Sequence, residues 1–177
     1  MTHQLKPPVG PQDHVQGKPD APVTLVEYGD YQCPYCGNAY SIVKRLQALM
    51  GQNMRFTFRN FPLVQMHPFA MAAAEIAEAA ALQGKFWQMH DRLYENQKAL
   101  DPESLMRHAQ HLHLDTAKLE VAIRGGEIAA RVQADFNSGV HSGVSGTPTF
   151  FINGQPFTGN WTDQEEFAAA LAAAAKA

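Results

Sequence analysis

The two cysteines of this 177-residue chain stand three positions apart, in the stretch CPYC, as Cys33 and Cys36. Pro34 lacks an N–H and suits the first position of a helix, where that N–H would have no partner. Cys33 is then the N-cap of a helix, and Cys36 lies one turn further inside it. Amides and the dipole at such an N-terminus stabilise a thiolate, and cysteines placed this way have pKa values of about 3.5–7 instead of about 8.5. The spacing therefore predicts a redox pair in which Cys33 attacks and Cys36 resolves the mixed disulfide.

A cysteine pair can also bind a metal or form an inert structural disulfide. A structural zinc site needs four ligands, and the chain has no second cysteine pair. His108, His111 and His113 are grouped, but on a predicted helix with no cysteine near them. A disulfide that closes so short a loop adds little stability by restricting the unfolded chain. We predict no metal ligands here and keep a non-enzymatic metal-binding module as an alternative only.

The segments around the cysteines indicate how the pair is held. Residues 23–30, VTLVEYGD, are short and rich in β-branched residues, as buried strands are. Residues 38–51 carry apolar side chains at helical spacing, and Gly51 can end that helix. Residues 54–64 alternate apolar and polar side chains, which predicts another strand. A strand, a helix and a strand in such close succession form a βαβ unit with parallel strands.

Helical patterns then follow one another between residues 68 and 139. One of these helices opens with Asp101 as N-cap and Pro102 at its first position. Phe86 and Leu93 belong to an apolar helix face that we interpret as packing, not as a cofactor site. This block has no strand-like segment.

Strand character returns in residues 147–154, where Asn153-Gly154 is typical of a two-residue hairpin turn. The chain closes on an alanine-rich helix, for which Thr162 and Glu165 predict a capping box. Two strands and a helix therefore follow the helical block.

The order of these elements predicts an α/β fold, with β-α-β and β-β-α units sharing one central mixed sheet and an all-helical insertion between them. We expect residues 22–66 and 140–177 to form the sheet domain and residues 67–139 the insertion. Residues 1–21 are polar and rich in Pro and Gly, which predicts a loose or surface-wrapped tail.

This arrangement resembles the thioredoxin fold, and specifically the DsbA-like thiol-disulfide oxidoreductases. The resemblance covers about residues 20–170 and rests on the stretches VTLVEYGDYQCPYC, FRNFPL, HPFAMAAAEIAEAAALQGKFWQMHDRLYENQ and SGTPTFFINGQPFTG. It implies that Pro148 follows a cis peptide bond against the active-site sulfurs. It also implies that the backbone of Thr147 is turned toward the disulfide, where it can pair with an extended substrate peptide.

The resemblance implies further site residues. Glu27 matches a buried acidic residue beneath the disulfide, which could exchange a proton with Cys36, and we expect burial to raise its pKa. Pro34 and Tyr35, between the cysteines, join Thr147 and Pro148 as candidate substrate-binding residues.

The chain departs from strongly oxidising relatives at Tyr35, where they have histidine. Without an imidazolium nearby the thiolate gains less stabilisation, so we predict a reduction potential nearer the glutaredoxin range than that of DsbA, which is about −120 mV. Arg59 could be a cation near the site or a solvated charge on a strand. His67, beside Pro68 at a helix start, is interpreted as structural.

Composition excludes several functional classes. The chain is 45% apolar and 18% charged, and its net charge of −3, with scattered Lys and Arg, predicts no binding to nucleic acid. No apolar run approaches the roughly 18 residues of a membrane span. The N-terminus lacks the apolar stretch of a secretory signal, so we expect a cytoplasmic location for the chain as given, or a periplasmic or extracytoplasmic one if a signal was removed.

These observations together predict a thiol-disulfide oxidoreductase without a cofactor, since no phosphate-binding glycine loop is present. Its expected partners are thiols and disulfides of other proteins, or small thiols such as glutathione, together with a redox partner protein. A glutathione-dependent transferase or isomerase on the same fold is the other alternative.

Overall fold

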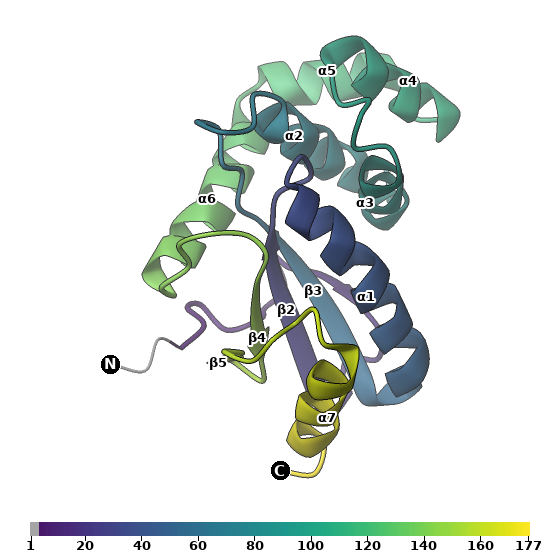
Figure 1. Ribbon diagram of the computed structural model, residues 1–177. Coiled ribbons are helices and arrows are strands. Elements are labelled where there is room, and N and C mark those ends of the chain that lie inside the picture. The colour runs from purple at the N-terminus through teal and green to yellow at the C-terminus, as the bar shows by residue number, and fades with distance from the viewer. Residues whose placement is uncertain (1–3) are drawn as a thin grey trace.

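The computed structural model describes residues 4–177, and its centre is the predicted mixed β-sheet (Figure 1). The strand order is β1-β3-β2-β4-β5. The central strands β2 and β3 run parallel, whereas β1 and β4 are antiparallel to their inner neighbours. The strands are β1 (His14–Gln16), β2 (Val23–Gly29), β3 (Met54–Asn60), β4 (Thr149–Ile152) and β5 (Gln155–Pro156).

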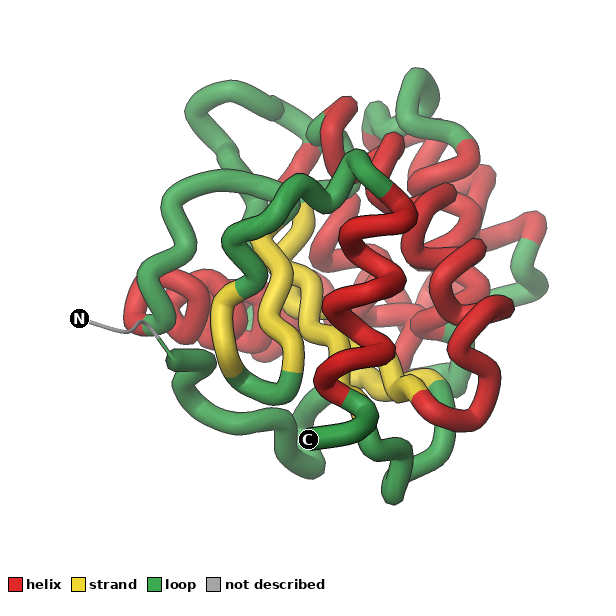
Figure 2. Tube along the Cα trace, turned by 60° about the horizontal axis from the view of Figure 1, so that its bottom comes forward, coloured by secondary structure: helices red, strands yellow, loops and turns green. Residues whose placement is uncertain are grey.

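Helix α1 connects the two parallel strands, as predicted, and α6 packs on the opposite face of the sheet (Figure 1). Helices α2 to α5 gather beyond one end of the sheet, near the start of α1, while α7 lies in front of the strands beside the C-terminus (Figure 2). The bounds are α1 (Pro34–Met50), α2 (Ala70–Ala81), α3 (Phe86–Glu95), α4 (Pro102–His111), α5 (Thr116–Arg124), α6 (Glu127–His141) and α7 (Gln164–Ala174), with a short 3-10 turn η1 (Gly51–Asn53).

Alternation along β2 directs its side chains into two separate cores. Leu25 faces the larger core under α1, α3 and α7, whereas Val26 and Tyr28 face a smaller core on the other side of the sheet. The smaller core is closed by Leu5 from the N-terminal segment and by Phe136 of α6. Residues 23–29 therefore form a strand that is buried on both faces, which explains why so few of them are polar.

The N-terminal segment is not loose, which corrects one of the two forms expected for the tail. Its residues 14–16 form β1 and pair with β3. Leu5 is buried, and Asp13 forms a salt bridge with Arg59 of β3 at 2.8 Å. Sequence reasoning missed this because a three-residue strand has too little pattern of its own and depends on its partner. Residues 1–3 of the expected tail lie outside the described residues.

The N-cap residue of α4 is the one predicted from the sequence, whereas the N-terminal cap of α7 differs from the prediction. Asp101 accepts a hydrogen bond from the Ser104 amide, as an N-cap does. The cap of α7 is Asp163, not the predicted box of Thr162 and Glu165. The Thr162 hydroxyl donates to the Asn160 side chain instead. The Asp163 carboxylate accepts hydrogen bonds from the amides of Glu165 and Glu166 in the first turn of α7.

Candidate active site

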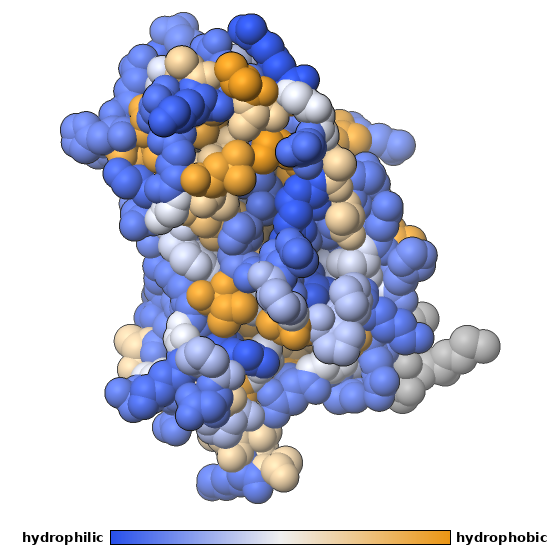
Figure 3. Space-filling model, turned by 180° about the vertical axis from the view of Figure 1, so that it is seen from behind, coloured by the Kyte–Doolittle hydropathy of each residue, from blue (hydrophilic) through white to orange (hydrophobic). Residues whose placement is uncertain are grey.

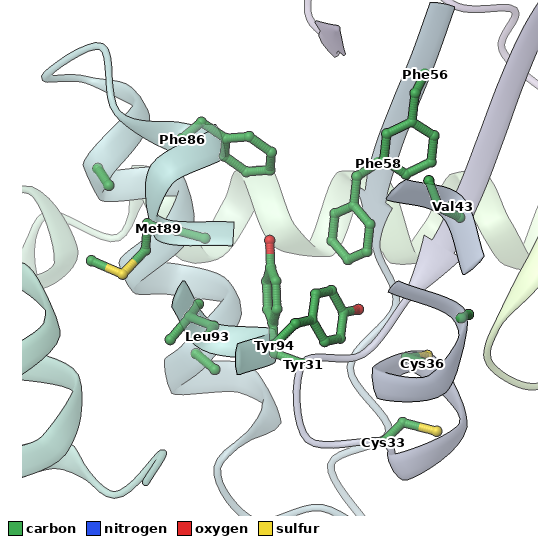
Figure 4. Packing of buried hydrophobic residues seen from close by; sticks show 14 of the residues in the cluster. Tyr31, Cys33, Cys36, Val43, Phe56, Phe58, Phe86, Met89, Leu93 and Tyr94 are labelled. Atoms are coloured by element: carbon green, nitrogen blue, oxygen red, sulfur yellow. The ribbon is translucent and has the colours of Figure 1, made fainter. Parts of the chain in front are cut away.

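Cys33 is the N-cap of α1, as the sequence predicts. Its backbone is extended (φ −67°, ψ 122°), Pro34 follows in the first turn, and the Cys33 carbonyl accepts the Gly37 amide at 3.1 Å. Cys36 lies within the first turn, so both sulfurs are at the start of this helix (Figure 4). The turn from β2 into α1 thus brings the pair to the edge of the sheet where the parallel strands end.

The Cys33 sulfur lies between the helix start and the loop before β4. Only 3% of the residue is exposed, and Sγ is 3.6 Å from the carbonyl oxygen of Thr147. A hydrogen bond with the Cys36 thiol is the largest of the effects that lower the pKa of Cys33 to about 5, and it outweighs the opposing effect of burial. Thr147 and the amides of Tyr35 and Cys36 add to the lowering. The direction agrees with the sequence prediction, but the neighbouring thiol contributes more than the helix amides.

The pKa of the Cys36 thiol is shifted in the direction opposite to that of Cys33. Cys36 is fully buried, and its Sγ accepts the amide of Asp30 at 3.5 Å. Burial, followed by its hydrogen bond with Cys33, raises the pKa of the Cys36 thiol well above its usual range. Near neutral pH the pair therefore holds one thiolate, at Cys33, and one thiol, at Cys36. In this structure both cysteines are free of a disulfide.

The loop before β4 supplies the other wall of the site. The Thr147–Pro148 peptide bond is cis, as the resemblance implied. Because β4 pairs with β2 directly after this bond, with Thr149 opposite Tyr28, the loop is held beside the cysteines. On the opposite wall Pro34 is exposed, and Tyr35 is 65% exposed.

Glu27 lies in the middle of β2 and is 1% exposed. Its Oε1 atom has no hydrogen-bond partner in residues 4–177. Burial first, and then the charge of Cys33, raise the pKa of this carboxyl to about 8. Both the burial of Glu27 and the raised pKa of its carboxyl agree with the expectation from the sequence. A carboxyl of this kind changes protonation in the pH range in which thiols are exchanged.

Sequence reasoning did not assign a role to Asp30, which ties the active-site turn together. One carboxylate oxygen accepts the Gln32 amide, and the other accepts the Leu63 amide and contacts His67 Nδ1 at 2.7 Å. His67 is thus part of the scaffold, in line with its structural interpretation. An aspartate directly before the turn was a visible signal, although its partners more than thirty residues away were not.

Gln97 was also missed. Its side-chain amide donates to the carbonyl oxygens of Tyr31 and Cys33, at 2.8 and 2.9 Å. The amide reaches these carbonyls by passing over Gly37, where a Cβ atom would overlap it. The sequence around Gln97 holds no signal for this contact, which depends on how the helical block is placed.

Arg59 has neither of the two roles expected from the sequence, a cation near the active site or a solvated charge on a strand. It is 2% exposed, so it is not a solvated charge, and its partners are in the scaffold and not at the cysteines. The guanidinium binds both carboxylate oxygens of Asp13, at 2.8 and 3.0 Å, and donates to the Tyr28 hydroxyl at 2.9 Å. It holds the N-terminal segment on the sheet.

The described residues 4–177 contain no group of three His, Cys, Asp or Glu side chains placed to hold a metal ion. His108, from the histidine cluster considered above, has protein partners on both ring nitrogens, Arg92 and the carbonyl of Ala99. These contacts give the metal-binding alternative no support.

The chain belongs to the thioredoxin family, since the family model described as Thioredoxin matches residues 10–173. A solved thioredoxin-like oxidoreductase from Silicibacter pomeroyi DSS-3 is 30% identical, with 95% of each chain covered and a TM-score of 0.84. BdbD from Bacillus subtilis, in its oxidised form, is 24% identical, with 100% of this chain and 98% of that chain covered and a TM-score of 0.82. The fold is that of the DsbA-like thiol-disulfide oxidoreductases.

Curated relatives match only over part of their length. The protein named Na(+)/H(+) antiporter NhaA 3 from Salinispora tropica is 44% identical over 174 residues, which are 98% of this chain and 26% of the relative. The one named Na(+)/H(+) antiporter NhaA from Herminiimonas arsenicoxydans is 39% identical over 158 residues, 89% of this chain and 25% of the relative. The chain spans about a quarter of the length of these relatives. Among its own described helices, none has the length and apolar character needed to cross a bilayer.

Proposed function

We propose that this protein exchanges disulfides with the thiols of other proteins through the Cys33–Cys36 pair. The observation that supports this most strongly is the position of Cys33 Sγ. It lies at a helix start, 3.6 Å from the carbonyl of Thr147 beside cis-Pro148, and the pKa of its thiol is about 5. Such a sulfur is a thiolate at neutral pH and a good leaving group in the disulfide.

The exchange can be written from these residues. In the oxidised form a substrate thiolate attacks Cys33 Sγ, the Cys33–Cys36 bond breaks, and Cys36 leaves with the electron pair and takes a proton, for which Glu27 is the candidate donor. A second substrate thiolate then attacks the substrate sulfur of the mixed disulfide and releases Cys33 as a thiolate. Run in reverse, the same steps reduce a substrate disulfide.

The substrate is proposed to lie extended along the loop at Thr147 and Pro148, with Pro34 and Tyr35 on the other side of the sulfur. Main-chain groups of a cis-proline loop can pair with any extended peptide, which suits proteins and small thiols such as glutathione alike. A redox partner protein would restore the pair after each cycle. Direction follows from potential and compartment: the pair reduces substrates in a reducing environment and donates its disulfide in an oxidising one.

Two serine variants test this proposal. We expect Cys33→Ser to lose more than 99% of the rate of disulfide exchange with a model dithiol peptide, because the attacking sulfur is gone. Cys36→Ser should instead accumulate the mixed disulfide at Cys33, which intact-mass spectrometry detects. Full exchange by Cys33→Ser would refute the proposal. Glutathione turnover that persists in Cys36→Ser would favour the transferase alternative, which does not depend on a cysteine pair.

A further inference from the structure

One polar side chain of the helical block, that of Tyr94, lies in the same core as the buried Cys36. Tyr94 belongs to α3, is 6% exposed, and packs with Tyr31 and Phe58 in the core beside α1 (Figure 4). Its hydroxyl is fully buried and has no hydrogen-bond partner in residues 4–177. A buried hydroxyl without a partner costs stability, so this one is expected to have a use.

The Tyr94 hydroxyl lies against Gly29, a residue without a side chain. Gly29 lies on the same face of β2 as Glu27, two residues further along, and a Cβ atom on Gly29 would be 2.9 Å from the Tyr94 hydroxyl oxygen. The Phe58 ring, which lies closest to that Cβ position, and the Tyr94 hydroxyl together fill the space that another side chain at position 29 would occupy. The next amide, that of Asp30, donates to Cys36 Sγ at 3.5 Å. The Tyr94 hydroxyl and the Cys36 sulfur therefore lie against the same short segment of backbone.

A second buried oxygen without a hydrogen-bond partner in residues 4–177, Glu27 Oε1, belongs to a side chain on the same face of β2 as Gly29. Burial, and then the charge of Cys36, raise the pKa of the Tyr94 phenol well above its usual range. The phenol therefore keeps its proton near neutral pH, and toward an anion it acts as a hydrogen-bond donor. The ionisable groups around it come from β2, the turn after it, α1 and α3, and they are Glu27, Asp30, Tyr31, Cys33, Cys36, Tyr40 and His90.

We propose that Tyr94 is a positioning residue for the resolving step, with a hydroxyl that donates to the negative charge formed on the Cys36–Glu27 pair. The inference rests on the proposed function. In that step the Cys36 proton passes to the Glu27 carboxylate, Cys36 Sγ bonds to Cys33 Sγ, and the bond from Cys33 to the substrate sulfur breaks. The substrate sulfur leaves as a thiolate with the electron pair. The charge thus moves through a buried site, where a hydrogen bond from a neutral donor has a large effect.

The test compares Tyr94→Phe with Tyr40→Phe. Tyr40 is the matched control, because its ring stacks on that of Tyr94 while its hydroxyl donates to Glu95 at the surface. Reduced protein is mixed with a disulfide peptide, quenched with acid at intervals, and the mixed disulfide at Cys33 is followed by mass spectrometry from pH 5 to 10. In Tyr94→Phe we expect formation of the mixed disulfide within about twofold of wild type, and its resolution about tenfold slower at pH 7. The midpoint of the pH profile of resolution should rise by about one unit.

Thermal unfolding of the reduced protein gives an independent readout. Because the hydroxyl is unpartnered, its removal should leave the melting temperature unchanged or raise it by a few degrees, which a merely structural hydroxyl would not do. Resolution at the wild-type rate and midpoint, an equal effect of Tyr40→Phe, or a lower melting temperature of Tyr94→Phe would each overturn the inference. Failure of the proposed function is distinguishable, because it would appear as exchange that persists in Cys33→Ser.

Discussion

At the scale of single residues, the two thiols of the CPYC motif differ because of their surroundings alone. At Cys33 the hydrogen bond with the Cys36 thiol and the helix amides outweigh burial, whereas at Cys36 burial is the largest effect. The pKa of Cys33 is lowered and that of Cys36 is raised. In a disulfide the sulfur with the lower pKa leaves more readily, so a substrate thiolate can displace Cys33 from the mixed disulfide.

Tyr35 offers a test of what sets the potential. We expect Tyr35→His to make the pair more oxidising by about 20–40 mV at pH 7, because an imidazolium would lower the pKa of Cys33 and one pKa unit corresponds to about 30 mV. The residue is 65% exposed, so solvent screens part of this effect. The potential is measured by equilibration with glutathione buffers, with Tyr35→Phe as control. An unchanged potential, or a wild-type potential near −120 mV, would contradict the expectation.

At the scale of elements, the sequence predicted what local patterns define. The strand-helix-strand unit around Cys33, the helix start at Pro34 and the turn at Asn153-Gly154, whose residues have φ of 48° and 79°, all follow from neighbours in the chain. The cis bond at Pro148 followed from resemblance only, since the local sequence favours trans.

Contacts between distant elements were not predictable from such patterns. Strand β1 exists because its partner β3 and the Asp13–Arg59 pair hold it, and Tyr94 and Gln97 reach the site only after the helical block has packed. Each of these residues is unremarkable in the sequence itself. Their roles depend on tertiary placement, which periodicity does not encode.

The attachment of the N-terminal segment can be measured. Asp13→Ala leaves the buried guanidinium of Arg59 without its carboxylate, and we expect the free energy of unfolding to fall by about 3–5 kcal/mol in urea titrations at pH 7. Glu103→Ala is the control, since it breaks an exposed pair with Arg107 and should cost no more than about 0.5 kcal/mol. Equal losses in the two variants would show that the buried pair does not hold the segment.

At the scale of the whole molecule, redox state should change stability. Folding lowers the pKa of Cys33 from an ordinary 9.0 to about 5, so the thiolate stabilises the reduced fold fully above pH 9, and this contribution is lost as the pH falls through 5. At pH 7 it amounts to about 2 kcal/mol, which corresponds to a melting temperature roughly 4–8 °C higher for the reduced than for the oxidised protein. Calorimetry of both forms from pH 4 to 8 measures the difference.

The control for this prediction is Cys33→Ser, which has no thiolate at this position and cannot form the disulfide. Its melting temperature should be the same with and without reductant. A gap between oxidised and reduced wild type that stays constant down to pH 4 would contradict the thiolate as its cause.

One face of the molecule, the one drawn in Figure 3, is largely hydrophilic. On the face opposite to that of Figure 1, hydrophobic residues form separate small patches among polar ones (Figure 3). Several exposed apolar side chains lie in the insertion, among them Leu82, directly after α2, and Val121 of α5. Scattered residues of this kind are ordinary on protein surfaces and do not by themselves indicate an interface.

The two outermost strands have a consequence for a protein whose proposed substrates are the thiols of other proteins. Open sheet edges invite foreign polypeptide to pair with them and so start aggregation. Here the long strands β2 and β3 are interior, while the borders are β1, with 3 residues, and β5, with 2 residues including Pro156, which has no amide hydrogen to offer. A substrate protein bound at the cysteines, as proposed, would therefore find little free strand backbone in this sheet with which to pair.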